Sequence, residues 1–199
     1  MSNDDLSDFR FRTVLLHDDA LNEEIVSLGK EVFPEMATAE EIHTLTEGYP
    51  DCQGEVIAMM RQEELMGFAF LLNYPAACFF NYFVIKPKYQ KKGMGGLLLK
   101  HVLKCAQGKP VLLTTWEPNV DYEDFLHHQF IKDFYIKNGF RCLSIRWFDP
   151  DDINRNMIFM LHGNLNEETC LKIMEDVQVM WDMQYVKNHP DSFKHLTND

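Results

Sequence analysis

The pattern of apolar and polar positions predicts a protein built from both strands and helices. Residues 9–16 alternate between apolar and polar side chains, as a strand with one buried face does. Apolar positions three and four residues apart then predict a helix over about 20–32 and a short second helix that begins at Thr38. We expect Asp18 and Asp19 to cap the first of these helices.

Three strand-like runs follow one another without an intervening helix. They cover about 55–61, 65–72 and 78–85, and the segments RQEE and NYPA between them are typical of turns. Strands joined by such short turns run antiparallel to one another. This part of the chain therefore predicts an antiparallel meander.

The remaining chain alternates helices with strands. We expect helices over about 97–106 and 126–138, strands over 111–116, 140–148 and 157–162, and a final amphipathic helix over 167–186. The helix over 97–106 connects the strand at 78–85 to the strand at 111–116, and such a crossover requires the two strands to be parallel. The prediction is an α/β (α+β) protein with a mixed, mostly antiparallel sheet of six or seven strands and helices on both faces.

The same pattern predicts how the chain is organised. Residues 1–163 are expected to form one domain, and residues 164–199 a helical extension that packs on it. The final helix has an apolar stripe, which we expect to cover the sheet or, alternatively, to pair two copies of the chain in a homodimer (Leu171, Met174, Val177 and Trp181).

Composition narrows the class of protein. The chain has 19 Lys plus Arg against 31 Asp plus Glu, a formal charge of -12, so we do not expect nucleic acid as a partner. No membrane is expected either, because the apolar run at 68–85 is interrupted by Asn73, Pro75 and Asn81. The five cysteines are scattered without a CxxC pair and the N-terminus is polar, which predicts a reducing, cytoplasmic location. No metal site is expected, because the adjacent His127 and His128 would diverge on a helix.

The segment FFNYFVIKPKYQKKGMGGLLLKHVLK, residues 79–104, carries the strongest chemical signal. A strand leads into a glycine-rich loop that opens a helix, and exposed amides at a helix N-terminus favour phosphate. Four lysines add local positive charge to an otherwise acidic chain (Lys86, Lys88, Lys91 and Lys92). The alternative is a solvated basic loop; a dinucleotide-binding loop or a P-loop is disfavoured, because the glycines follow the strand too late and no Gly-Lys-Ser/Thr is present.

Two motifs in this order resemble the GCN5-related N-acetyltransferase (GNAT) superfamily. QKKGMG at 90–95 resembles the family's pyrophosphate loop, Arg/Gln-x-x-Gly-x-Gly/Ala, and DFYIKNGF at 133–140 resembles its helix-to-strand segment. The resemblance covers roughly 9–163. It implies the acyl-CoA N-acyltransferase fold, with acetyl-CoA as cosubstrate and no metal.

The resemblance also implies site residues. Phe83, Val84 and Ile85 match the place where the family's fourth strand separates from the fifth and leaves backbone groups free for the pantetheine arm. The pyrophosphate would lie against the loop and the start of the helix (Gln90, Lys91, Lys92, Gly93, Met94, Gly95 and Gly96). His128 stands where the family often has an Asn that contacts the cofactor, which leaves that contact open. Tyr135 matches the tyrosine that protonates the departing thiolate.

The implied reaction is direct attack of a primary amine on acetyl-CoA. An amine with a pKa of about 10 is mostly protonated at neutral pH, so a base or an ordered water must take a proton. Glu117 is the first candidate for this base, with Glu55 and His128 as further candidates. The loop 116–129 interleaves carboxylates with aromatic residues, which favours a cationic amine through ion pairing and cation–π contact.

The acceptor class stays open at this point. A small amine or polyamine, an aminoglycoside-like antibiotic and a protein N-terminus all fit the sequence. The alternative function is a non-catalytic acyl-CoA-binding sensor or interaction module, because no residue is a clear base.

Overall fold

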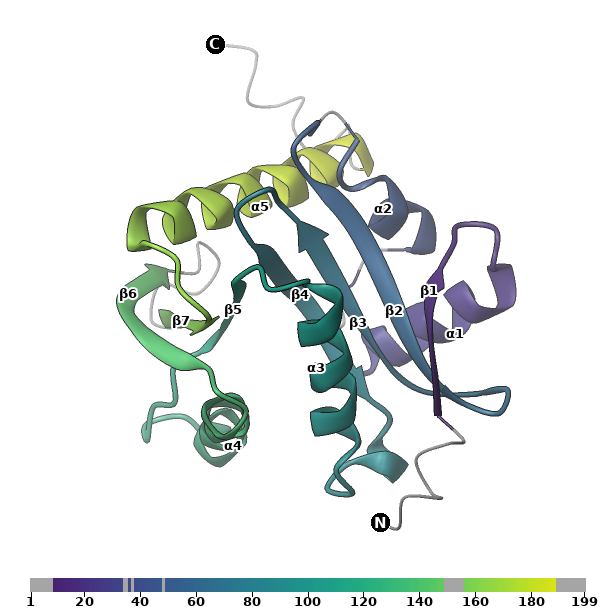
Figure 1. The fold of residues 1–199 in the computed structure, drawn as a ribbon, viewed down its shortest axis with the longest axis horizontal. Helices are drawn as coiled ribbons and strands as arrows, with labels where there is room; N and C mark the ends of the chain where they lie inside the picture. The colour runs from purple at the N-terminus through teal and green to yellow at the C-terminus, as the bar shows by residue number, and fades with distance from the viewer. Residues whose placement is uncertain (1–8, 34–35, 37, 48, 149–155, 189–199) are drawn as a thin grey trace.

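A seven-stranded mixed sheet forms the centre of the molecule (Figure 1). The computed structural model describes residues 9–33, 36, 38–47, 49–148 and 156–188. The elements are β1 (Phe9–Val14), α1 (Asp19–Lys30), α2 (Ala39–Thr44), β2 (Gln53–Arg61), β3 (Glu64–Asn73), β4 (Cys78–Ile85), the 3₁₀ turn η2 (Pro87–Tyr89), α3 (Met94–Cys105), β5 (Val111–Trp116), α4 (Phe125–Lys137), β6 (Arg141–Phe148), β7 (Asn156–His162) and α5 (Glu167–Asn188). Residues 149–155, which connect the strands predicted at 140–148 and 157–162, lie outside the described residues.

The strand order is β1-β2-β3-β4-β5-β7-β6. All neighbouring strands pair antiparallel except β4 and β5, which are parallel and are joined through α3. The predicted meander, the crossover and the mixed sheet with helices on both faces are therefore confirmed.

Two apolar layers hold helices against opposite faces of the sheet. One layer contains α1, α2 and α5, whose buried side chains include Ile25, Ile42 and Val177. The other layer contains α3 and α4, with Leu98 and Tyr135 among its members. In Figure 1, α4 is seen almost end-on while α3 lies in the plane of the picture, so the two helices on this face are not parallel.

The final helix covers the sheet, as expected for one of the two alternatives. Its buried positions are Cys170, Ile173, Met174, Val177 and Met180, which belong to the same apolar layer as α1. Among the described residues, no helix is long and apolar enough to cross a membrane.

The two N-terminal helices begin differently. Thr38 accepts a hydrogen bond from the Glu41 amide, and the Glu41 carboxylate accepts one from the Thr38 amide, so α2 begins with a capping box. Asp18 occupies the N-cap position of α1, but its side chain makes no capping bond. The expected side-chain cap is thus wrong: the Asp18 carboxylate pairs with Arg12 at 2.7 Å and accepts a bond from the Leu15 amide at 3.0 Å.

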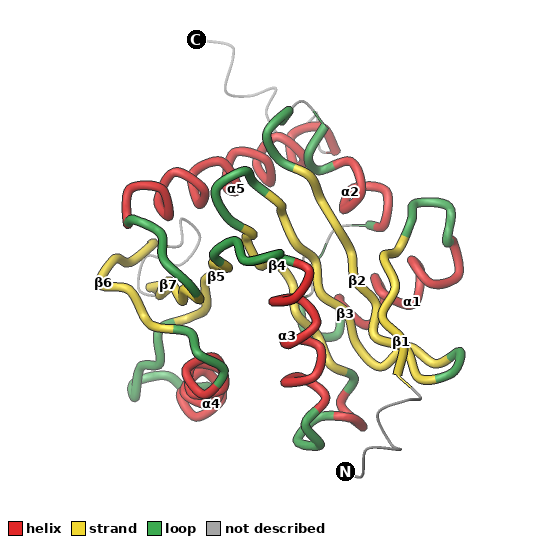
Figure 2. Tube along the Cα trace, viewed as in Figure 1, coloured by secondary structure: helices red, strands yellow, loops and turns green. Residues whose placement is uncertain are grey.

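The parallel strands β4 and β5 separate midway, and this separation positions the site. Their pairing ends at Phe80 and Leu113, although β4 continues to Ile85 and β5 to Trp116 (Figure 2). The β3–β4 register shifts at the same place, between Phe70 and Leu71. Backbone groups of β4 beyond this point therefore have no strand on the β5 side.

Candidate active site

The loop after β4 leads into the first backbone amides of α3. Gly93 is the N-cap of α3 and has φ +84°, a left-handed conformation that side chains rarely adopt. Apart from its chain neighbours, no described residue has an atom within 4 Å of the position that a Cβ at Gly93 would take, and the first turn of α3 carries no acidic residue. The first amides of a helix have no intrahelical acceptor, so this end of α3 offers donors to an anion.

Two of the four loop lysines are held by carboxylates from other elements. Lys86 Nζ pairs with Glu24 on α1 at 2.6 Å, and Lys88 pairs with Glu64 on β3. These two carboxylates therefore offset part of the positive charge that the four lysines bring to the loop. Lys91 and Lys92 are exposed and directly precede Gly93, and Lys92 Nζ donates to the Lys88 carbonyl at 2.8 Å.

The backbone of β4 faces two ways beyond the point of separation. The Lys86 amide donates to the Met66 carbonyl of β3 at 2.8 Å. By the two-residue alternation of antiparallel pairs, Val84 also faces β3, whereas Phe83 and Ile85 face the side that β5 has left. Of the three strand residues predicted to contact a cofactor, Phe83 and Ile85 present backbone groups to this side and Val84 does not.

A side-chain amide lies at each end of the part of β4 that has no partner strand on the β5 side. Gln90 Nε2 donates to the Ile85 carbonyl at 2.9 Å, so Gln90 closes the loop onto β4. Asn81 lies at the register shift, and its Nδ2 is buried without a hydrogen-bond partner among the described residues. Because a buried donor without an acceptor is costly, an oxygen-bearing ligand arm fits here.

Tyr135 lies on the inner face of α4, near the start of α3. Its ring packs against Phe134 and Phe140, with centroids 5.2 Å and 5.3 Å away. Phe134 in turn approaches Gly95, whose Cβ would stand 3.4 Å from the ring, and lies 6.2 Å from Phe83 on β4. Burial raises the pKa of Tyr135, so its hydroxyl stays protonated at neutral pH.

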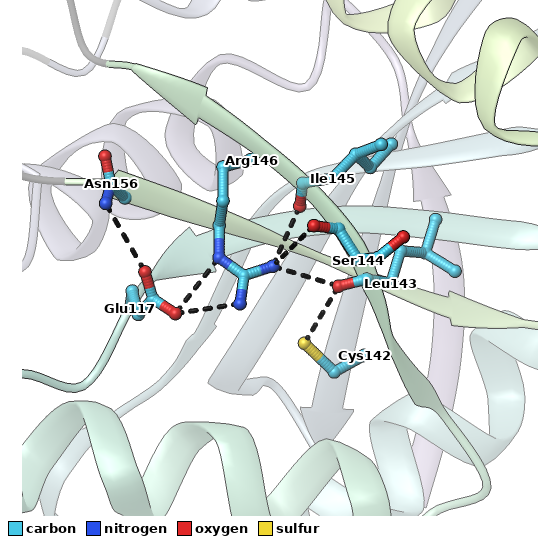
Figure 3. A network of polar contacts seen from close by, with 7 residues as sticks. All are labelled: Glu117, Cys142, Leu143, Ser144, Ile145, Arg146 and Asn156. Atoms are coloured by element: carbon cyan, nitrogen blue, oxygen red, sulfur yellow. Dashed lines mark hydrogen bonds and ion pairs between the residues drawn. The ribbon is translucent and has the colours of Figure 1, made fainter.

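Glu117 belongs to a polar network rather than standing free (Figure 3). Its Oε1 accepts bonds from Arg146 Nε at 3.0 Å and Nη2 at 2.9 Å, and its Oε2 lies 3.5 Å from Asn156 Nδ2. The third guanidinium nitrogen, Nη1, donates to the carbonyls of three successive β6 residues, Leu143, Ser144 and Ile145. These bonds satisfy the backbone where the β6–β7 register shifts.

The network reduces the suitability of Glu117 as a general base. Its Oε1 already accepts two bonds from Arg146, so this oxygen is not available to take a proton from an amine. The ion pair in turn holds the pKa of Arg146 above its usual value.

A cavity of about 270 Å³ lies beside Glu117, beyond the end of β5. Its lining includes Trp116, Glu117, Tyr122, Asp124, His128 and Asn156. His128, predicted to contact the cofactor, therefore lies with Glu117, seven residues along α4 from Tyr135. Its Nε2 pairs with Asp124 Oδ2 at 3.1 Å, and its Nδ1 is buried without a partner among the described residues.

Arg146 and Asn156 were not singled out from the sequence, although they shape this site. In the sequence, Arg146 is a charged residue between apolar residues of a predicted strand. In the structure, this strand, β6, is at the edge of the sheet. Within the described parts of the chain, no group of His, Cys, Asp and Glu side chains is arranged to hold a metal ion.

The fold and the separated strands define the class first: this is the acyl-CoA N-acyltransferase architecture. The family model of the GNAT acetyltransferase domain matches residues 52–142, which span β2 to the start of β6. Residues 52–142 thus match the GNAT acetyltransferase domain, the family that the two sequence motifs resemble. No curated protein matches the chain by sequence.

Solved structures share this fold at low identity. A GNAT-family acetyltransferase from Bacteroides thetaiotaomicron superposes with a TM-score of 0.66 at 19% identity, covering 92% of this chain and 98% of its own. The aminoglycoside 6'-N-acetyltransferase from Enterococcus faecium gives 0.59 at 18% identity, covering 79% and 98%. PaiA N-acetyltransferase from Thermoplasma acidophilum, solved with coenzyme A, gives 0.53 at 16% identity, covering 78% and 99%. These likenesses establish the fold.

Proposed function

We propose that this protein transfers the acetyl group of acetyl-CoA to a primary amine by direct attack in a ternary complex. One observation carries the proposal: the unpaired side of β4 lies next to the first amides of α3, which have no intrahelical acceptor. An extended ligand with a diphosphate at one end and amide groups along its length matches both features.

The residues around this opening fit coenzyme A. The amides of Met94, Gly95 and Gly96, with the side chains of Lys91 and Lys92, would hold the diphosphate. The backbone groups of Phe83 and Ile85 would bond the amides of the pantetheine arm, and the buried Nδ2 of Asn81 would donate to a carbonyl. The PaiA structure, which contains coenzyme A, supports this assignment through its shared fold.

Bound acetyl-CoA supplies an activated acetyl thioester. Charge builds on the thioester oxygen during attack, and a backbone N–H of β4 facing the opening, that of Phe83 or Ile85, would stabilise it. The Tyr135 hydroxyl, which is protonated at neutral pH, would donate a hydrogen bond or a proton to the departing sulfur, although burial raises its pKa and makes it a weaker acid. An ordered water would remove the proton from the amine, because Glu117 is committed to Arg146.

The same commitment favours a second candidate function, a non-catalytic acyl-CoA sensor. Such a protein would bind coenzyme A through the loop and the opening but would lack turnover. The retained Tyr135 favours the enzyme.

A thiol-release assay with a panel of primary amines separates the two functions. The enzyme should release coenzyme A only when an acceptor is present, whereas a sensor should bind coenzyme A in calorimetry and release none with any amine. Absence of coenzyme A binding, or tighter binding of ATP or NAD, would contradict both.

A further inference from the structure

The cavity beyond β5 is rich in atoms that accept hydrogen bonds. Both bonds from Arg146 go to Oε1 of Glu117, so Oε2 keeps only the 3.5 Å contact with Asn156 among the described residues. Asn156 also lines the cavity. Oε2 is thus a carboxylate oxygen held in place by Arg146 and still able to accept a bond.

His128 provides a second acceptor. Nε2 donates to the Asp124 carboxylate, and in the neutral form of the ring this leaves a lone pair on Nδ1. The His128 side chain is only 11% exposed, and Nδ1 has no hydrogen-bond partner among the residues that the structure describes. A buried lone pair of this kind is complementary to a ligand N–H.

The walls and the charge of the cavity favour a cation. Trp116 and Tyr122 contribute aromatic rings, which attract an ammonium group. Among the described residues, the carboxylates of Glu117 and Asp124 stand against one guanidinium, that of Arg146. Arg146 itself is turned toward Glu117 and the β6 carbonyls.

The distance between the cavity and Tyr135 indicates which ammonium group of an acceptor the cavity would bind. His128 and Tyr135 stand seven residues apart on α4, which places them about 10 Å apart along the helix axis. Gly95 approaches Phe134, next to Tyr135 and at the far end of α4 from His128. An ammonium group in the cavity is therefore separate from the amine that meets the thioester.

We propose that the cavity binds a second ammonium group of the acceptor, so that the acceptor is a diamine or a longer polyamine. This inference rests on the proposed function, because it takes Tyr135 as the mark of the reacting end. Glu117 Oε2 and His128 Nδ1 accept bonds from the second ammonium group, while the first amine reacts.

Matched amines test the proposal. The series 1,3-diaminopropane to 1,8-diaminooctane is compared with n-alkylamines of the same carbon number, and kcat/KM is measured for each. The ratio of diamine to monoamine should rise to about tenfold once the chain is long enough to reach the cavity. Equal values along the whole series would overturn the proposal.

Variants locate the effect. Glu117→Gln keeps the size of the side chain and should bring the ratio close to one, as should His128→Leu, which leaves the Arg146–Glu117 pair intact. Asp121→Asn is the control, because Asp121 is an exposed carboxylate of the same loop and does not line the cavity. The proposal would be overturned if the ratio of diamine to monoamine stayed at its wild-type value in both cavity variants. It would also be overturned if the two variants changed only the KM for acetyl-CoA.

Calorimetry separates this inference from the proposed function. 1,8-Diaminooctane titrated into the coenzyme A-saturated protein should bind, and Glu117→Gln should weaken that binding about tenfold. Lack of coenzyme A binding and turnover would contradict the proposed function. Coenzyme A binding without a diamine signal would overturn the cavity assignment alone.

Discussion

The two ends of the candidate site are built from different materials. The loop at the start of α3 uses main-chain amides, a left-handed Gly93 and a side-chain bond from Gln90 to its own strand. The cavity beyond β5 uses side chains from β5, α4, β6 and β7 and their connecting loop. A diphosphate can therefore be recognised by a local stretch of backbone, whereas recognition of the acceptor depends on side chains that only the folded sheet brings together.

The backbone end is tested most strongly by Gly95→Asp. A carboxylate here would replace charge-assisted bonds to phosphate with repulsion, and we expect coenzyme A affinity to fall about 1000-fold, equivalent to about 4 kcal/mol. An acidic residue in the first turn of a helix favours folding, so the unfolding midpoint should stay equal or rise. Calorimetry and thermal unfolding on the same sample measure the two effects.

Two controls accompany this variant. Gly95→Ala places a methyl group in ordinary contact with Phe134 at 3.4 Å and should bind coenzyme A far better than the aspartate. Lys100→Asp adds a carboxylate on the exposed side of the same helix and should change affinity little. Wild-type affinity in Gly95→Asp would remove the loop from the site.

Tyr135 lies on α4 next to Phe134, which contacts Gly95, and seven residues from His128 of the cavity, and Tyr135→Phe tests its chemistry. The ring should keep its contacts with Phe134 and Phe140, while loss of the hydroxyl should lower kcat about 100-fold and leave the Kd for coenzyme A within about twofold. Steady-state kinetics and calorimetry separate these quantities. A wild-type kcat would rule out a role in thiolate protonation.

The same variant has a pH signature. Burial raises the folded-state pKa of Tyr135 above that of the unfolded chain, so its contribution to stability is complete below about pH 10 and is lost as the pH rises further. Tyr135→Phe should therefore reduce the loss of stability in alkaline solution. Denaturant unfolding between neutral and alkaline pH measures this difference.

The contrast between the two ends also explains what the sequence alone predicts. Strand and helix positions follow from short-range periodicity, and β4 at 78–85 and β5 at 111–116 have the predicted bounds. The glycine-rich loop is also local, so its place before α3 is predictable. Asp18 shows the limit: its type fits a helix cap, but Arg12 on β1 competes for its carboxylate.

Contacts between side chains that are far apart in the chain cannot be predicted from local sequence patterns. Lys86 and Lys88 lie in one basic segment, yet their partners are on α1 and β3. Likewise, Glu117 and Arg146 are far apart in the chain and meet across β7, which pairs with both β5 and β6. Side-chain sites that span several strands depend on the order of strands in the sheet, which local patterns do not fix.

The side-chain end is tested by Arg146→Met, which keeps an apolar stem. The variant leaves Glu117 without its cation and three β6 carbonyls without their donor, and we expect a loss of about 2 kcal/mol in the free energy of unfolding. Glu117→Gln should cost less, because its amide oxygen can still accept from Arg146. Denaturant unfolding of both variants and of the double variant measures the coupling, and a loss in Arg146→Met no larger than in Glu117→Gln would contradict this network.

The smallest effect is expected for Glu64→Gln, which removes the ion pair between Lys88 of the cofactor loop and β3. Lys88 and Tyr89 hold the pKa of Glu64 below its usual value of 4.5, so the pair contributes above that pH and is lost as the pH falls through the lower, folded-state value. The pair is largely solvent-exposed, and Gln can still accept the bond from Tyr89, so the KM for acetyl-CoA should rise only about twofold. A change as large as that of Gly95→Asp would mean that side-chain ion pairs, rather than the backbone of α3, hold this end of the site together.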